Sequence, residues 1–199
     1  MNDYKNSASW AKLISFLTNP AFVVIVCLAV ISERYATTFE QAFRWTVLAT
    51  ILLVLPGFTY VTATTWSREN HIDIDVTRRE DRVIPLMLAT LGAVVAGSLI
   101  STRLISPQLV LLSQILVAML VSLTIVTLLW KISLHAATFS ALVTLLVLYG
   151  GLLFATGYVI LLPIAWSRLV LKQHTPLQLT GGAIVGVVVT LLSALVLGK

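Results

Sequence analysis

The sequence predicts an all-α protein, a bundle of about six or seven helices that span a membrane. Hydrophobic residues make up 58% of the 199 positions and charged residues only 11%. A water-soluble domain of this size keeps a largely polar surface, which this composition does not supply. The apolar residues also gather in runs near the ~20 residues that a helix needs to cross a bilayer. We therefore expect an integral, multi-pass membrane protein, in the cell or plasma membrane of a prokaryote.

Seven apolar runs follow one another along the chain. The predicted spans are residues 12–32, 43–63, 84–102, 108–130, 134–149, 152–166 and 177–197. Pro20, Pro56 and Pro163 fall within these runs, where membrane helices tolerate a kink. Gly182 and Gly186 have the G-x-x-x-G spacing that is typical of a close-packed helix face. No internal repeat or linker interrupts the chain, so we expect a single integral membrane domain over residues 1–199.

Residues 134–166 are open to two interpretations, one long tilted helix or two short helices separated at Gly150-Gly151. Each short helix would reach only ~22 Å at 1.5 Å per residue, below the ~30 Å hydrocarbon core. Short spans are tolerated where their ends are buried in protein. We prefer two helices, because they keep the polar breaks at 131–133 and 167–176, and all three histidines, on one side of the membrane.

Composition excludes several classes of protein. Cys27 is the only cysteine and lies in an apolar run, so an intrachain disulfide and a cysteine metal cluster are both ruled out. The net charge is +5 and its cations are scattered along the chain. A nucleic-acid partner would require a basic stripe on a soluble face, so we expect none.

The first polar segment that can carry chemistry is residues 68–85, which contain four arginines and five of the eight acids. One interpretation is a solvated loop whose charges pair with each other, which contributes little to stability. Arg82, however, directly precedes a span, where an unpaired charge is costly and usually functional. Arg79 lies three residues before Arg82, so the two share a face of a helical turn.

The second polar segment combines Lys131 with Ser133 and His135 at the start of an apolar run. Ser133 is a favourable N-cap for the helix that follows. The free N–H groups and the positive potential of a helix start attract anions. The alternative is an ordinary capped helix with an interfacial lysine and a hydrogen-bonded histidine.

The third polar segment contains Ser167 and Arg168, with His174 six residues after the arginine. A Thr-Pro pair then suits a helix start. Gln178 lies one helical turn after His174, so its amide can reach one nitrogen of the imidazole. Cations for the oxygens, a nucleophile and an acid for the leaving group are what phosphoryl transfer requires.

These segments together resemble the signatures of the type 2 phosphatidic acid phosphatase family, membrane-embedded enzymes that remove phosphate from lipids without a metal. The family's Ser-Arg-x5-His-x3-Asp signature is matched in type and spacing by Ser167, Arg168 and His174. Its Pro-Ser-Gly-His signature is matched in part, by Ser133 and His135.

The match is weaker elsewhere. Ile132 and Leu134 replace the proline and the glycine of the second signature. In the first signature, Arg82 fits the arginine, Pro85 is displaced by two residues, and Asp75 stands where a lysine is usual. The resemblance covers residues 65–195, which we expect to form a phosphatase-like core.

The resemblance implies a role for each matched residue. His174 would be the nucleophile that forms a phosphohistidine, and His135 would protonate the leaving alkoxide. The phosphoryl oxygens would be held by Arg82, Arg168, Lys131, Ser133 and Arg79. No metal and no cofactor is implied.

Gln178 is the main departure from the family. It stands where the family has an aspartate that orients the nucleophile and stabilises its cationic form. A comparable carboxylate-to-amide change in serine proteases costs about 10⁴ in rate. Either Asp73 or Asp75 supplies the missing carboxylate, or the chain is a slow or inactive relative.

The expected function is hydrolysis of a phosphate or diphosphate ester of an isoprenoid or glycerolipid. The alternative is a catalytically weak or inactive relative that binds lipid phosphate or supports a membrane assembly. The partners are a lipid phosphate from the bilayer and membrane lipids, with a homo-oligomer or a membrane-complex partner left open.

Two other classes are less well supported. A haem or metal protein would use His135 and His174 as ligands, but arginines beside the site would repel a metal cation. A prenyltransferase is suggested by the acids near residues 73–81. Those enzymes use two aspartate-rich magnesium motifs, and this sequence has only one acidic loop.

Overall fold

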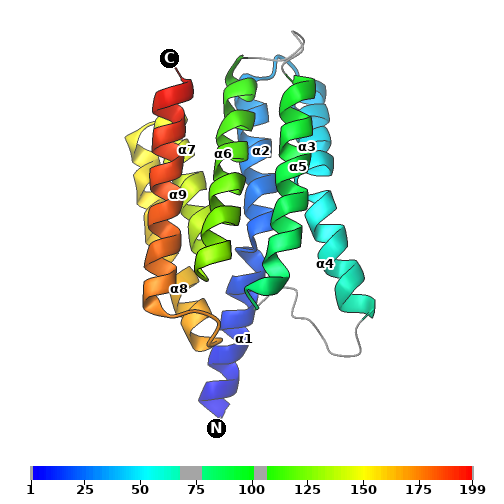
Figure 1. Cartoon of the computed structure of the whole chain (residues 1–199). Coiled ribbons are helices and arrows are strands. Elements are labelled where there is room, and N and C mark those ends of the chain that lie inside the picture. Colours follow the sequence, from blue (N-terminus) through cyan, green and yellow to red (C-terminus); the bar gives the residue numbers. More distant parts are fainter. Residues whose placement is uncertain (1, 68–77, 101–106, 199) are drawn as a thin grey trace. The chain divides into compact units, whose positions relative to one another are not determined.

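The computed structural model describes residues 2–67, 78–100 and 107–198, and all regular structure in these residues is helical (Figure 1). The α-helices are α1 (Asn2–Leu17), α2 (Pro20–Tyr35), α3 (Phe39–Leu53), α4 (Leu55–Ser67), α5 (Val83–Ile100), α6 (Pro107–Leu129), α7 (Leu134–Gly150), α8 (Leu161–Val170) and α9 (Pro176–Leu197). Two 3₁₀-helices are η1 (Glu80–Arg82) and η2 (Leu152–Ile160). The predicted all-α class is confirmed for the described residues.

The chain folds as two compact units. The first unit comprises Met1–Val23 and Lys131–Leu191, and the second comprises Val24–Trp130 and Leu192–Lys199. Within the first unit, α1 packs against α8, and α7 packs against η2 and α8. Within the second unit, α5 contacts α3, α4 and α6. The expectation of a single membrane domain stays a prediction.

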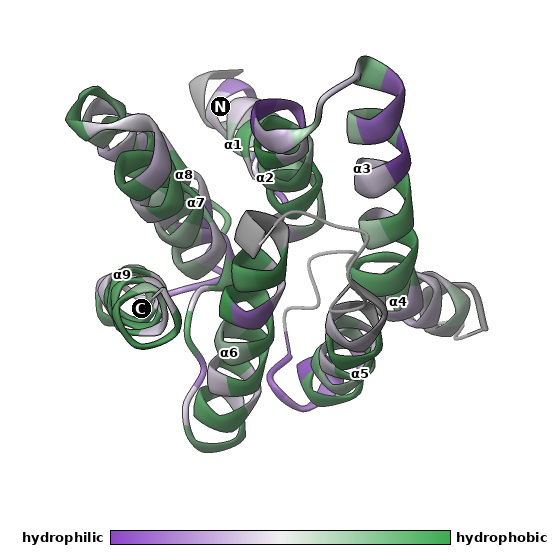
Figure 2. Ribbon diagram, turned by 90° about the horizontal axis from the view of Figure 1, so that it is seen from above, coloured by the Kyte–Doolittle hydropathy of each residue, from purple (hydrophilic) through white to green (hydrophobic). Residues whose placement is uncertain are grey.

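Three helical stretches in the described part of the chain are long and apolar enough to cross a membrane: Val110–Leu129, Leu152–Val170 and Pro176–Leu197. The number rises to five if each of two bent helix pairs, α1 with α2 and α3 with α4, forms one span. In Figure 2, hydrophobic residues predominate on the visible turns of α6 and α9. Membrane-spanning helices are therefore supported, whereas the expected six or seven spans are not confirmed.

Both bends lie at prolines that the sequence places inside apolar runs. The α1–α2 pair bends by 43° before Pro20, and the α3–α4 pair bends by 46° before Pro56. Proline lacks an N–H, and its ring clashes with the carbonyl four residues earlier. At the first bend, the Asn19 N–H instead donates to the Phe16 carbonyl, three residues back (3.2 Å). The expected kinks are thus present at these two prolines.

Residues 134–166 form two helical segments, as the preferred interpretation predicts. α7 ends at Gly150, and η2 begins at Leu152. Gly151 between them has a φ of +105°, a conformation in which a Cβ would be strained. The glycine pair therefore interrupts the helix.

α9 packs closely against α7 along Gly182 and Gly186. A Cβ added at Gly182 would lie 2.4 Å from the Ser133 carbonyl oxygen, and one at Gly186 would lie 2.2 Å from that of Ala137. The Ser140 hydroxyl donates to the Ala183 carbonyl across the same contact (3.0 Å). The G-x-x-x-G pair is therefore a close-packing face, as its spacing predicts.

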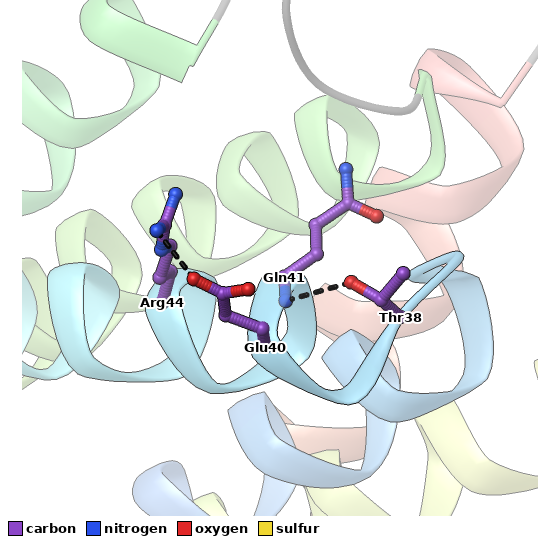
Figure 3. A network of polar contacts seen from close by, with 4 residues as sticks. All are labelled: Thr38, Glu40, Gln41 and Arg44. Carbon is purple, nitrogen blue, oxygen red and sulfur yellow. Dashed lines mark hydrogen bonds and ion pairs between the residues drawn. The ribbon is translucent and has the colours of Figure 1, made fainter.

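In the second unit, α3 begins with a box of the form Thr-x-x-Gln (Figure 3). The Thr38 hydroxyl accepts from the Gln41 N–H (3.2 Å), and the Gln41 side-chain oxygen accepts from the Thr37 N–H (2.8 Å). Glu40 and Arg44 form an exposed ion pair on the next turn. The threonine hydroxyl thus satisfies one of the N–H groups that a helix start leaves without an intrahelical acceptor, and the glutamine oxygen fixes the residue that enters the helix.

Candidate functional site

The interval between Arg168 and His174 forms a helix-ending turn in the first unit. The Gln173 N–H donates to the Arg168 carbonyl and the Lys172 N–H donates to the Leu169 carbonyl, each at 3.0 Å. Lys172 has a φ of +54°. This is the Schellman pattern, which satisfies the last carbonyls of a helix. It ends α8 and leads the chain directly into His174, before α9.

α9 begins with a second Thr-x-x-Gln box, and His174 joins it. The Thr175 N–H donates to the Gln178 Oε1 (3.2 Å), and the Gln178 N–H donates to the Thr175 hydroxyl (3.3 Å). The same Oε1 lies 3.1 Å from the His174 Nδ1. The expected contact between Gln178 and His174 is therefore present.

This geometry fixes the tautomer of His174. A backbone N–H can only donate, so the Gln178 atom that faces both Thr175 and His174 is the carbonyl oxygen and not the amide nitrogen. The His174 Nδ1 must then carry a proton. In the neutral ring the lone pair then lies on Nε2.

His135 lies buried in the first turn of α7 and has the opposite tautomer. The Ser133 hydroxyl accepts from the Ala136 N–H (3.3 Å), which confirms the predicted N-cap. The His135 Nε2 lies 3.1 Å from the carbonyl oxygen of Ser15. A carbonyl can only accept, so Nε2 carries the proton and Nδ1 the lone pair in the neutral ring.

A backbone hydrogen bond joins the two histidine-bearing segments. The Ser133 N–H donates to the Gln178 carbonyl oxygen at 3.0 Å. Gly182, one turn further along α9, lies against the Ser133 backbone. The structure therefore brings together the two polar breaks that the sequence placed on one side of the membrane.

Arg168 is 0% exposed although its side chain is permanently charged. Its Nη1 donates to the Ser15 hydroxyl. Ser167 beside it is also fully buried, and its hydroxyl donates to the Ile164 carbonyl of the same helix (2.8 Å). Burying a charged side chain in a membrane protein costs free energy, and such side chains are usually functional. This favours an anion site at Arg168.

Ser15 is the residue of this cluster that the sequence reasoning missed. It lies on α1, outside residues 65–195, yet its two oxygens contact His135 and Arg168. A serine within an apolar run carries no signal that separates it from an ordinary helix serine. Only the packing of α1 against α8 identifies it.

The other predicted cations occupy different places. Lys131 is partly buried at the start of the second polar break, in the first unit. Arg82 is buried in η1, and Arg79 precedes it, both in the second unit. Arg79 donates to the Leu129 carbonyl at the end of α6 (3.1 Å), a favourable place for a cation. Phosphate binding by Arg79 and Arg82 stays a prediction.

Asp73, Asp75 and His71 lie outside the described residues, so a carboxylate contributed by this loop also stays a prediction. Within the described residues, no three His, Cys, Asp or Glu side chains gather as a metal site would require. No family model matches the chain, and no curated protein and no solved structure matches it either.

Proposed function

We propose that this protein is a membrane lipid phosphatase that hydrolyses a phosphate or diphosphate ester of an isoprenoid or glycerolipid through a phosphohistidine. The observation that carries the proposal is the Ser133–Gln178 backbone hydrogen bond. It joins the segments of His135 and His174 in the compact unit that also buries Arg168.

His174 is the nucleophile in the proposed reaction. Its Nδ1–H is held by the Gln178 side-chain oxygen, which directs the lone pair to Nε2. Nε2 attacks the phosphorus atom, a P–N bond forms, and the P–O bond to the lipid breaks. A positioned nucleophile of this kind divides one difficult hydrolysis into two easier steps.

His135 donates and then accepts a proton in the proposed reaction. As an imidazolium it gives a proton to the departing lipid alkoxide, and it becomes neutral. In the second step the neutral ring takes a proton from a water molecule, whose oxygen attacks the phosphohistidine. The P–N bond then breaks, inorganic phosphate leaves, and both histidines return to their starting states.

The phosphoryl oxygens are held by positive charge and by the start of a helix. Arg168 supplies a buried guanidinium, whose field is strong because water is excluded. The capped start of α7 at Ser133 supplies backbone N–H groups and a positive dipole end. The proposal also assigns Lys131, in the same unit, to these oxygens.

The test is phosphate release from a panel of lipid phosphates in the presence of a chelator. The His174→Ala variant is expected to lose at least about 10³-fold in rate. The matched control is Thr37→Ala, which changes the residue before the Thr-x-x-Gln box of α3 and should leave the rate unaltered. Equal release by the wild-type protein and His174→Ala on every substrate would contradict the proposal.

One observation favours a second function, binding of lipid phosphate without turnover. Gln178 brings no negative charge to the His174 Nδ1, and its oxygen is shared with the Thr175 N–H. A protein that only binds lipid phosphate needs the cations that hold the phosphate, but it does not need a carboxylate beside the histidine nucleophile. Flotation with vesicles that contain a lipid phosphate distinguishes the two. Binding that Arg168→Gln abolishes, without any phosphate release, supports this second function.

A further inference from the structure

We infer that the last turn of α1 belongs to the site, with Ser15 as a positioning residue for both His135 and Arg168. This inference rests on the proposed function and extends it to a helix outside residues 65–195. Ser15 is only 2% exposed. Its carbonyl oxygen lies 3.1 Å from the His135 Nε2, and its hydroxyl accepts from the Arg168 Nη1.

Pro20 explains why a backbone carbonyl of α1 is directed to a side chain. The last four carbonyls of a helix have no intrahelical donor, and Ser15 lies in the last turn of α1. Pro20 has no N–H to offer to Phe16, so the Asn19 N–H donates to the Phe16 carbonyl. The Ser15 carbonyl accepts from His135 in this turn.

The packing face of α1 brings the serine to its partners. Ala11, one turn before Ser15, is 0% exposed, and α1 packs against α8. The small side chains of Ala11 and Ser15 let the two helices approach closely, as small residues do in membrane proteins. Arg168 on α8 thereby meets the Ser15 hydroxyl.

The carbonyl contact determines which nitrogen of His135 exchanges a proton. With Nε2–H held by Ser15, the imidazolium keeps that proton throughout the cycle. The proton that goes to the leaving alkoxide comes from Nδ1, and Nδ1 takes the proton of the attacking water. The hydroxyl contact orients the Arg168 guanidinium before phosphate arrives, so less ordering is needed during binding.

The first experiment reads the tautomer of His135 without any turnover. Protein labelled with ¹⁵N-histidine is purified and its ring nitrogens are recorded by NMR at about pH 8.5, about two units above the ordinary histidine pKa. The His135 signals are assigned by their loss in His135→Gln. We expect His135 to be in the Nε2–H form and His174 in the Nδ1–H form.

The Pro20→Ala variant restores an N–H at position 20, which lets the Asn19 N–H return to the Ser15 carbonyl. We expect the Nε2–H preference of His135 to weaken or disappear. Pro56→Ala, at the other bent helix pair, is the matched control and should leave the His135 signals unchanged. An Nδ1–H tautomer in the wild-type protein, or an unchanged His135 in Pro20→Ala, would overturn the carbonyl contact.

A separate variant tests the contact between the Ser15 hydroxyl and Arg168. Ser15→Ala keeps the carbonyl, so the His135 tautomer should persist, while binding of inorganic phosphate weakens by about tenfold, the effect of one hydrogen bond to a charged group. Phosphate binding is followed through the His174 signals. The control is Ser113→Ala, a buried serine whose hydroxyl donates to the Val110 carbonyl of its own helix.

Equal phosphate binding by Ser15→Ala and Ser113→Ala would overturn the role of the hydroxyl. Both readouts are independent of catalysis. Absence of phosphate release by the wild-type protein would therefore refute the proposed reaction, while the NMR signals would still decide whether Ser15 holds His135 and Arg168.

Discussion

Two helices of this protein, α3 and α9, begin with the same Thr-x-x-Gln box in very different surroundings. In both, the threonine hydroxyl accepts from the glutamine N–H, at 3.2 Å in α3 and 3.3 Å in α9. In both, the glutamine oxygen also accepts from the residue before the threonine. That residue is Thr37 in α3 and His174 in α9.

The difference lies in burial and charge. Thr37 and Thr38 are exposed, and the nearby Arg44 forms an ion pair at the surface. At α9, His174 is buried, and Arg168 is buried six residues earlier. A local sequence pattern thus specifies the helix start in both units, and the packing around it decides whether a histidine and a cation can form a site.

The two units also differ in how many polar or charged residues they bury. Of fourteen buried polar or charged residues in the described parts of the chain, four belong to the second unit. The ten in the first unit are Ser15, Ser133, His135, Ser140, Thr144, Ser167, Arg168, Gln173, His174 and Thr190. The larger, second unit therefore has the more apolar interior.

Among these comparisons, the largest difference is expected between substitutions of the arginine near each box. Arg168→Gln should slow phosphate release by about 10²–10³-fold, because the proposed reaction uses this buried charge to stabilise the transferring group. Arg44→Gln should leave the rate unchanged, since an exposed ion pair contributes little. Equal rates for both variants in the phosphate-release assay would remove the distinction between the two boxes.

The packing within the two units can be compared through one glycine of each. Gly186→Ala should lower the free energy of unfolding by about 1–3 kcal/mol, as overpacking does, because its Cβ would meet the Ala137 carbonyl. Gly97→Ala in α5 should be neutral or stabilise by up to about 1 kcal/mol, since its Cβ would lie 3.6 Å from the nearest atom, the Ser113 hydroxyl. Denaturant unfolding in detergent measures both.

Replacing each of the two glutamines with glutamate tests the effect of a negative charge at the same position in both boxes. Gln178→Glu keeps the side-chain length and adds a negative charge beside the His174 Nδ1. A hydrogen bond to a charged group contributes about 1 kcal/mol more than a neutral one, so phosphate release should rise by about 5- to 10-fold. Gln41→Glu should only stabilise α3, by about 0.3–1 kcal/mol. A slower Gln178→Glu variant would show that the missing charge does not limit the rate.

The smallest effect concerns the turn that precedes the α9 box. Lys172 has a φ of +54°, and this conformation costs a residue with a Cβ about 1 kcal/mol. Lys172→Gly should therefore raise the free energy of unfolding by that amount and leave phosphate release unaltered. Gly151→Ala, at a φ of +105°, should have the opposite effect on stability. A destabilised Lys172→Gly variant would argue against the helix-ending turn.

Local sequence patterns predicted the helix starts and helix ends around the site more successfully than they predicted which residues meet there. The Ser133 cap, the helix start after Thr175, the Gln178–His174 contact and the interruption at Gly150-Gly151 all depend on neighbours within a few residues. The number of spans was harder to predict, because Pro20 and Pro56 bend two helix pairs where hydropathy shows continuous runs, and because α7, with 17 residues, is shorter than the candidate spans. The expected six or seven spans are not confirmed.

The sequence by itself determined that the chain is helical and apolar, where its helices are capped or broken, and which polar side chains are candidates for a phosphate site. These properties depend on composition and on contacts between residues a few positions apart. Only the tertiary structure decided that Ser15 meets His135 and Arg168 from 120 and 153 residues away. It also joined Ser133 to Gln178. Such contacts depend on how closely α1 and α8, and α7 and α9, can approach, which small side chains at Ala11, Ser15, Gly182 and Gly186 allow.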